Sequence, residues 1–267
     1  MLYFVATPIG NLDDITLRAI EVLKSVDCIY CEDTRHSLKL LNKLQIKKPL
    51  FSYHKFNEKK EAEEIIEKLN KGLNIAVISD AGMPVISDPG NVLTKRLVEE
   101  DVNFTVVPGA TAFASALILS GLDASRFTFI GLLPEKAKDR DNLLKNYKNT
   151  TETLIFYSAP HDINDDLKDL YNILGDRKVA VVKEITKMHE MALHFNLKDA
   201  KIENPKGEFV IVVEGGTNTK NQFNALSLEE HINFYIESGL SKKDAIKKVA
   251  EERSVSKNSL YKYTIEK

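Results

Sequence analysis

Short runs rich in β-branched and aromatic residues alternate with helical patterns through the first half of the chain. We expect the first five strands at about 2–7, 27–32, 49–53, 73–78 and 102–107. Strands that alternate with helices are typical of a mostly parallel sheet built from βα units, because each parallel connection has to cross a face of the sheet. The expected fold class is therefore α/β.

The helical pattern is clearest between the third and fourth expected strands. Apolar residues from Ala62 to Leu69 recur with the spacing of one helix face, which predicts an amphipathic helix over 59–70. Gly72 is positioned to end this helix.

A second α/β block is expected after a polar stretch at 119–126, which interrupts the apolar pattern and predicts a hinge. The connections in this block are longer, so we expect a mixed sheet. Its expected strands lie at about 127–131, 153–157, 178–184 and 208–214, with a further candidate at 187–196 and helices near 139–147 and 162–173.

The chain from about residue 227 differs from the rest and predicts a small three-helix unit that resembles a helix-turn-helix. Ser241 and Asp244 match an N-capping pattern before an apolar helix face, and Ser256 is placed to cap a final helix. The charge of this unit does not by itself indicate nucleic-acid binding. The expected domains are 1–119, 120–224 and 225–267.

The overall charge limits the classes of partner. The chain has 267 residues with 37 basic and 39 acidic side chains, for a net charge of −2. This balance argues against a protein that simply coats DNA or another polyanion, although it allows a local basic patch. The sequence shows neither a secretory leader nor a transmembrane run. We therefore expect a cytoplasmic protein without a membrane or DNA partner.

Cys28 and Cys31 are the only cysteines and have the CxxC spacing of redox sites. They fall inside an expected strand rather than at the start of a helix, so their side chains should point to opposite faces as buried structural residues. Two cysteines are too few for a four-thiolate zinc site, and the histidines lack metal-ligand spacing. We expect no metal.

Four loops that follow expected strands contain unusual residues, at 7–11, 32–36, 79–90 and 107–111. Ligands of open α/β sheets bind beyond the carboxyl ends of strands, so these loops are the candidate binding regions. The third loop has two each of Gly, Pro, Asp and Ser. It is either an ordinary turn-rich connection or a binding loop, and its two closely spaced aspartates favour binding. The chain lacks both the dinucleotide fingerprint and the P-loop, which disfavours NAD and ATP.

The loop at 32–36 places two acids, an arginine and a histidine in five residues. Helix capping explains at least part of the role of Asp33 and Thr34. It does not explain Arg35 and His36, which are suited to an anionic substrate at the mouth of a cleft.

Nine segments together, in this order along nearly the whole chain, resemble the ribosomal RNA small-subunit methyltransferase I family within the tetrapyrrole methylase superfamily. The segments are ATPIGNLDDITLRA (6–19), CEDTRHSLKLL (31–41), SYHKFNE (52–58), SDAGMPVISDPG (79–90), GLLPEK (131–136), LIFYSAPH (154–161), KEITKMHE (183–190), KGEFVIVVEG (206–215) and GLSKKDAIKKVA (239–250). No single segment is specific, but the combination is.

The resemblance implies two α/β domains with S-adenosylmethionine bound in the cleft between them. It further implies a homodimer that transfers the methyl group to the 2′-hydroxyl of a cytidine in small-subunit (16S) ribosomal RNA, either naked or in the assembled small subunit. The cofactor-binding residues carried over by motif are Asp80, Ala81, Gly82, Met83, Pro84, Ser87, Ala110, Thr111, Phe129, Leu132, Tyr157, Ser158, Ala159 and Pro160.

The chain departs from the family pattern at two of these places. Family members commonly have PGPSA at 108–112 and YESPHR at 157–162, where this chain has PGATA and YSAPHD. The segment at 183–190 keeps the pattern of Glu184, Thr186, Lys187 and His189, which favours the rRNA branch over a porphyrin methylase.

Removal of the hydroxyl proton during methyl transfer calls for a carboxylate or imidazole in the cleft. Asp33 and Asp88 lie on cleft loops and are the candidate catalytic residues. The basic residues expected to contact the RNA backbone are Arg35, His36, Lys183, Lys187 and His189.

Three other functions stay open from the sequence. A small-molecule methyltransferase of the same fold would use the same cofactor loops but not the C-terminal helices. A non-enzymatic RNA-binding protein would explain those helices but not the loop at 79–90. A DNA-binding regulator would need a recognition helix more basic than 257–267.

Overall fold

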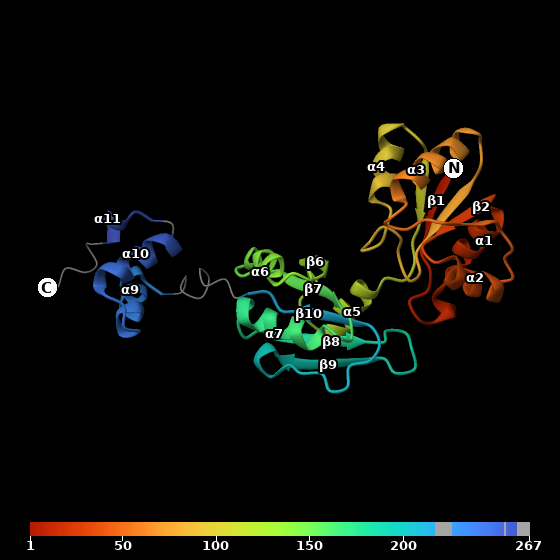
Figure 1. The fold of residues 1–267 in the computed structure, drawn as a ribbon. Coiled ribbons are helices and arrows are strands. Elements are labelled where there is room, and N and C mark those ends of the chain that lie inside the picture. The colour runs from red at the N-terminus through yellow and green to blue at the C-terminus, as the bar shows by residue number, and fades with distance from the viewer. Residues whose placement is uncertain (217–225, 254, 261–267) are drawn as a thin grey trace.

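The computed structural model describes residues 1–216, 226–253 and 255–260. Figure 1 shows two α/β domains, each built on a five-stranded sheet, and a separate group of helices near the C-terminus. The domains adjoin each other, and the C-terminal helices lie on the far side of the second domain from the first.

The first sheet is entirely parallel, with strand order β3-β2-β4-β1-β5. All five expected strands are present and slightly shorter than predicted. Their bounds are β1 Leu2–Val5, β2 Cys28–Cys31, β3 Leu50–Ser52, β4 Ile75–Ile78 and β5 Phe104–Val107.

Helices cover both faces of this sheet because strand residues alternate between the faces. Cys28 packs in the core shared with α3 and α4, and Cys31 packs in the core shared with α1 and α2. Both cysteines are buried and free, which confirms the structural interpretation of the CxxC spacing. The helices are α1 Leu17–Ser25, α2 Thr34–Lys43, α3 Glu58–Asn70 and α4 Asn91–Glu99, and a 3₁₀ turn η1 spans Leu12–Asp14.

The connections leave β1 and β4 in opposite directions across the sheet, so the loops after these two neighbouring strands meet at the switch point of the sheet. The backbone N–H of Thr7 donates to the carbonyl of Gly82 at 2.9 Å, and the N–H of Gly82 donates back at 3.1 Å. These two bonds fasten the loop after β1 to the loop after β4.

The second sheet is mixed, as expected, with order β6-β7-β10-β8-β9. Only β6 and β7 are parallel, and the other neighbours are antiparallel. The candidate strand at 187–196 is present but begins at Met191. The strands are β6 Phe127–Leu132, β7 Thr153–Ser158, β8 Lys178–Lys183, β9 Met191–Asn196 and β10 Phe209–Val213, with α6 Ala137–Lys145, α7 Ile163–Leu174 and a 3₁₀ turn η2 Leu197–Asp199.

Helix α5, Ala112–Ser120, precedes the expected hinge at 119–126 but packs against the second sheet. Its Ala116 and Leu117 share a core with Ile155 of β7 and Val182 of β8. Ile9, from the loop after β1, also enters this core. The chain thus passes from one sheet to the other before α5, so the helix belongs structurally with the second sheet.

The C-terminal helices form their own small core, which includes Ile232, Ile246, Val249 and Leu260. Ser241 and Ser256 each accept a backbone N–H three residues later, so both predicted caps are confirmed. A capping box of Ser227 with Glu230, which the sequence analysis missed, begins the first of these helices. The helices are α9 Leu228–Glu237, α10 Lys242–Arg253 and α11 Lys257–Leu260.

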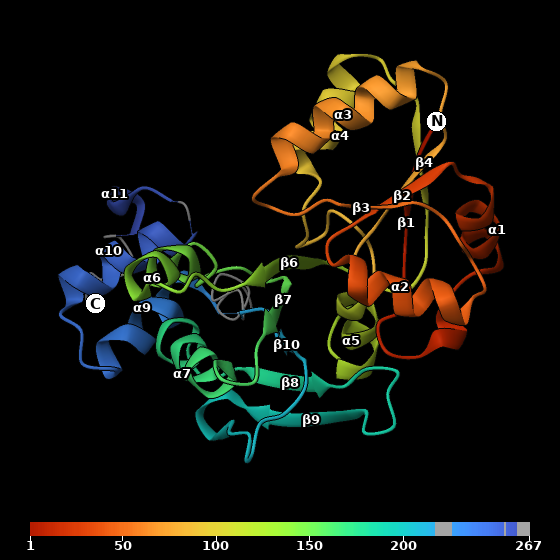
Figure 2. The ribbon, with the colours of Figure 1, turned by 45° about the vertical axis from the view of Figure 1, so that its right-hand side comes forward.

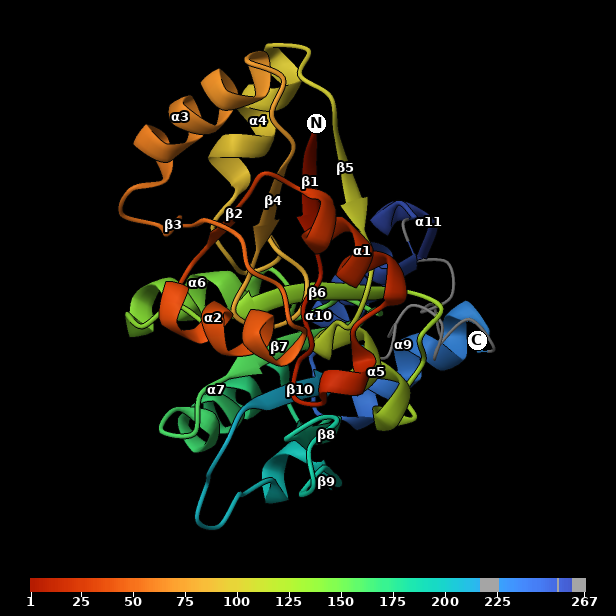
Figure 3. The same cartoon turned by 90° about the vertical axis from the view of Figure 1, so that its right-hand side faces the viewer.

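Glycines mark two close approaches between the α/β domains. A Cβ on Gly10 would stand 2.6 Å from Cγ of Lys187 and 2.8 Å from Oγ1 of Thr186. A Cβ on Gly131 in β6 would stand 3.0 Å from Oγ of Ser87 in the loop after β4. Figure 3 shows the first sheet standing over the second, with the loops of both in between.

Replacing Gly131 by Ala should destabilise the protein more than replacing Gly121 by Ala. Both glycines have a positive φ, +80° and +64°, so both substitutions cost roughly 1–2 kcal/mol of backbone strain. Of these two positions, only the Cβ at 131 also meets the opposite domain, since nothing lies within 4 Å of one at 121. Urea unfolding should show an extra loss of about 1 kcal/mol or more for Gly131→Ala. Equal losses would mean that this approach does not constrain the domains.

Candidate active site

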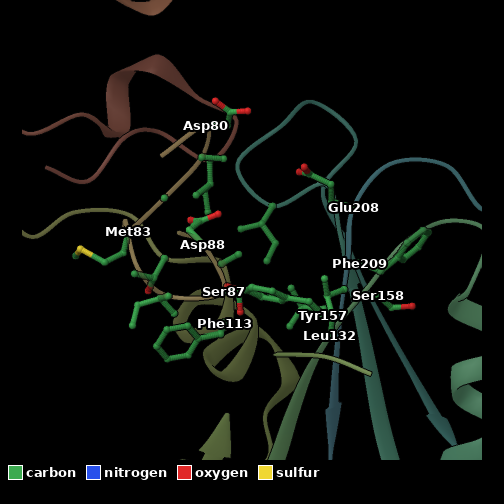
Figure 4. A pocket seen from close by; sticks show the side chains of 18 of the residues that line it. Asp80, Met83, Ser87, Asp88, Phe113, Leu132, Tyr157, Ser158, Glu208 and Phe209 are labelled. Atoms are coloured by element: carbon green, nitrogen blue, oxygen red, sulfur yellow. The ribbon is translucent and has the colours of Figure 1, made fainter. Parts of the chain in front are cut away.

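A cavity of about 410 Å³ lies between the two α/β domains and is lined by loops of both. Figure 4 shows Asp80, Ser87 and Asp88 on the first-domain side, with Leu132, Tyr157 and Glu208 on the other. The cavity lies at the switch point of the first sheet, where an α/β fold is expected to bind its ligand.

The first-domain wall is the loop between β4 and α4, which is held in a strained conformation. Val85 and Ser87 have φ values of 74° and 63°, a region that non-glycine residues rarely adopt. Hydrogen bonds hold the beginning of the loop, because Ser79 Oγ donates to the carbonyl of Gly82 at 3.0 Å and Thr7 Oγ1 donates to the carbonyl of Ser79 at 3.2 Å. Strain of this kind is concentrated at ligand-binding loops.

The second-domain wall combines the end of β7 with the start of β10. These strands are antiparallel, and Phe209 pairs with Ser158, so the first residues of β10 lie beside the segment 157–160. Ser158 Oγ donates to Oδ2 of the buried Asp166 at 2.6 Å, and Arg140 lies 3.5 Å from Oδ1 of the same carboxylate. The chain thus places a buried carboxylate from α7 directly behind the serine that replaces the glutamate of the family pattern.

Three aromatic rings pack together at this wall, and two of them, Phe113 and Tyr157, line the cavity. Phe113 of α5 stacks on Phe129 with ring centroids 4.7 Å apart, and Phe129 meets Tyr157 edge to face at 5.0 Å. Burial raises the pKa of Tyr157, and the nearby carboxylates of Asp88 and Glu208 raise it further. The tyrosine hydroxyl therefore stays protonated at neutral pH and can donate a hydrogen bond in the cavity.

Asp88 is the titratable group in the cavity whose pKa is best suited to accept a proton. Burial raises its pKa to about 7, with further contributions from the negative charges of Glu32 and Asp80. A carboxyl group with a pKa near neutrality is half ionised at working pH, and that is the range in which general bases are most effective.

Asp33 has a different environment and lies outside the cavity lining. It caps α2 by accepting the N–H of Arg35 at 2.8 Å, and its side chain pairs with the Arg35 guanidinium at 3.0 Å. The hydrogen bonds from the Arg35 side chain and backbone lower its pKa to about 2, which makes it a weak base. Its own N–H donates to Asp80 Oδ1 at 3.2 Å, so it contacts a cavity residue only through its backbone.

The expected RNA-binding residues differ in their surroundings. Lys187 lies 3.0 Å from Glu184 and 3.1 Å from Glu208, so its ammonium group is already ion-paired and holds Glu208 at the rim of the cavity. Arg35 has an 89% exposed side chain and pairs with Asp33. His36 and His189 are exposed, and Lys183 at the end of β8 is half-buried.

Eleven of the fourteen expected cofactor residues line the cavity; Pro84, Ala110 and Phe129 do not. The lining residues are Asp80, Ala81, Gly82, Met83, Ser87, Thr111, Leu132, Tyr157, Ser158, Ala159 and Pro160. Eight further lining residues were not selected from the sequence, and they are Ile9, Ile86, Ala112, Phe113, Ile185, Glu208, Phe209 and Val210. Most of these lie within or beside the segments quoted for the family resemblance, which was the available signal.

The lining suits a cation with an attached aromatic ring system. Asp80, Asp88 and Glu208 supply negative charge, while Ile9, Leu132 and their neighbours supply apolar surface. The volume lies in the range of small-molecule sites, about 300–1,000 Å³. Within the described ranges 1–216, 226–253 and 255–260, no three His, Cys, Asp or Glu side chains are grouped so that they can hold a metal ion. Of the helices in those same ranges, none is both long and apolar enough to cross a bilayer.

Comparison with known proteins gives consistent matches. The family model described as Tetrapyrrole (Corrin/Porphyrin) Methylases matches residues 1–201. The chain is 44% identical to the ribosomal RNA small subunit methyltransferase I of Halalkalibacterium halodurans, over 97% of this chain and 93% of that protein. A Thermotoga maritima protein of the same name is 42% identical over 80% of this chain and 98% of its own length.

Among solved structures, the methyltransferase CobJ superposes with a TM-score of 0.63 at 18% identity, covering 80% of this chain and 94% of that chain. Identity at this level supports the fold alone. The sequence matches reach further, because they exceed 40% identity over 97% and 80% of this chain. The chain therefore belongs to the tetrapyrrole methylases and, within them, to the ribosomal RNA small-subunit methyltransferase I family.

Proposed function

We propose that this protein transfers a methyl group from S-adenosylmethionine to the 2′-hydroxyl of a cytidine in small-subunit (16S) ribosomal RNA. The observation that carries this proposal is the cavity between the two domains, which brings most of the residues expected to bind the cofactor together with the buried carboxyl group of Asp88. The names of the relatives support RNA as the substrate. Such a substrate implies a cytoplasmic location.

The cofactor fits the cavity by charge and by shape. S-adenosylmethionine supplies an electrophilic methyl group on a positively charged sulfur. Asp80 and Asp88 provide negative potential for that cation, and Gly82 lets the backbone approach, since its φ of +81° is unstrained only in glycine. Leu132 and the segment 157–160 would close over the cofactor from the second domain.

The chain's residues would act mainly by holding the reacting atoms in line. Correct alignment of a nucleophile with the methyl group supplies several kcal/mol of the rate enhancement in reactions of this type. Asp88 would accept the hydroxyl proton as the new oxygen–carbon bond forms, because its pKa is suited to that transfer. We therefore assign the base to Asp88, while Asp33 holds the start of α2.

Basic side chains around the cavity would bind the RNA backbone. His36 and His189 are exposed and available to phosphates, Arg35 is exposed and pairs with Asp33, and Lys183 lies at the end of a strand that leads to the cavity. Lys187 would act differently, because it holds Glu208 through an ion pair. Lys187 could contact a phosphate only if that phosphate replaced Glu208 as its ionic partner.

We also propose a homodimer, which an exposed apolar surface supports. Ile118 of α5 is 79% exposed, and Val106 of β5 and Phe127 of β6 are 44% and 42% exposed. β5 and β6 are each the edge strand of a sheet. Figure 3 shows α5 and these two strands on the same side of the molecule. A surface of this kind is suited to an interface between two copies.

The proposed reaction can be tested by tracing a radiolabelled methyl group. Small subunits, naked 16S rRNA and a tetrapyrrole precursor should be offered in parallel with labelled S-adenosylmethionine. We expect label in RNA, recovered after alkaline hydrolysis as a dinucleotide, because a 2′-O-methyl blocks cleavage at its own phosphodiester. Label in mononucleotides would indicate base methylation, and label only in the tetrapyrrole would overturn the RNA assignment.

Asp88→Asn should lower kcat by about 10²-fold or more, because general bases contribute at least that much. In the wild-type enzyme, kcat/KM should rise as the pH increases through about 7, because Asp88 of the free enzyme ionises in that range. The variant should lose this rise. Initial rates between pH 5.5 and 8.5 measure both effects.

Asp33→Asn is the matched control for that substitution. Asp33 has a pKa of about 2 and is ionised throughout this pH range, so its variant should keep the rise near pH 7. Folding provides a second control. Because the pKa of Asp88 is raised from 3.8 to about 7 by folding, the wild-type protein loses stability as the pH rises between these two values, and the loss is complete at pH 8. Asp88→Asn should therefore be at least as stable as wild type at pH 8. An Asp33 variant as inactive as the Asp88 variant would contradict the assignment.

A further inference from the structure

We propose that Phe56 stacks on an unpaired base of the RNA substrate and so positions the target strand at the cavity. This inference rests on the proposed function. Phe56 lies in the turn between β3 and α3, and 96% of its surface is exposed. No cavity residue and no expected RNA-binding residue comes from this turn.

The exposure of Phe56 is built into the turn. Asn57 Oδ1 accepts the N–H of His54 at 2.8 Å, and Asn57 Nδ2 donates to the carbonyl of Ser52 at 3.0 Å. The N–H of Asn57 donates to the carbonyl of His54 at 3.0 Å. Asn57 thus closes the turn through three hydrogen bonds, which leaves Lys55 and Phe56 at its tip. These bonds fix the backbone of the turn, so Phe56 is held at a position that faces away from the core.

The turn is fastened to the loop that contains Asp88. Oε1 of Glu58, the first residue of α3, accepts the N–H of Gly90 at 2.8 Å and that of Val92 at 3.0 Å. The same oxygen accepts the hydroxyl of Tyr53 at 3.1 Å, so both ends of the turn meet at this carboxylate. A base stacked on Phe56 would therefore be held at a fixed position relative to the loop at 80–90.

Exposed lysines lie on both sides of Phe56 in the sequence, and Glu58, the acidic residue between them, accepts hydrogen bonds from the loop at 90–92. Lys55, Lys59 and Lys60 are exposed, and within the part of the chain that the structure describes none of them forms an ion pair within 4.0 Å. The ring of His54 lies edge-on to Phe56, with centroids 6.1 Å apart. Figure 2 shows the segment between β3 and α3 at the side of the first domain that faces the second, opposite α6.

This combination fits a nucleic acid better than an apolar protein surface. Unpaired RNA bases bind by stacking on aromatic side chains while their phosphates contact cations. Docking of a protein would require a continuous apolar patch, and the neighbours of Phe56 at the tip are charged or polar. A single projecting ring among lysines therefore points to a base with its phosphates.

The test compares Phe56→Ala, Phe56→Leu and Phe56→Trp in binding to isolated small ribosomal subunits that lack the methyl group. The Ala and Leu variants should bind about 5- to 150-fold more weakly, the range expected for one lost base stack, and the Trp variant should bind as wild type does. The salt dependence of binding should stay unchanged in all three, because a stacked ring releases no counterions. Lys55→Gln should instead reduce the slope by less than about one unit.

Val98→Ala is the control. Val98 is an apolar side chain that is 68% exposed near the C-terminal end of α4, and the end of α4 bonded to Glu58 is the other one. This variant should bind the subunits as wild type does. Wild-type affinity in Phe56→Ala would overturn the proposal, and so would wild-type affinity in Phe56→Leu, which would indicate an apolar protein contact. Loss of S-adenosylmethionine binding by calorimetry in Phe56→Ala would also overturn it, by showing a structural role. Methylation of the same subunits by the wild-type enzyme, measured in parallel, tests the proposed function separately.

Discussion

The structure depends on the close approach of two α/β domains through small residues. Gly10 lies against Thr186 and Lys187, and Gly131 lies against Ser87, so neither contact leaves room for a side chain. Ile9 adds an apolar anchor by entering the core of the second domain. The cavity exists only because both domains line it. The burial that raises the pKa of Asp88 therefore depends on these contacts as much as on its own loop.

The cavity concentrates features that do not help the protein to fold. Val85 and Ser87 adopt left-handed backbone conformations, and burial together with neighbouring negative charge makes ionisation of Asp88 unfavourable. Hydrogen bonds donated by Thr7 and Ser79, and one that Glu58 accepts from the N–H of Gly90, hold this loop in place despite the strain. A cationic cofactor would relieve the repulsion among the carboxylates, so binding and ionisation of Asp88 should favour each other.

Much of the fold could be predicted from the sequence because its patterns are local. The alternation of strands with helices and the caps at Ser241 and Ser256 each depend on a few neighbouring residues, and these predictions are confirmed. The sheet against which α5 packs could not be predicted, because apolar residues lie on all faces of this helix and do not indicate which face is buried. Glu208 was missed for a related reason. It precedes β10, and only the antiparallel pairing with β7 brings the start of that strand to the cavity.

We propose that both domains form one site for the cofactor. Hydrogen–deuterium exchange with and without S-adenosylmethionine tests this, because it reports on each backbone segment separately. We expect the cofactor to slow exchange together at 80–88 in the first domain and at 131–133 and 157–160 in the second. Slower exchange confined to the segments of one domain would show that the site does not span both.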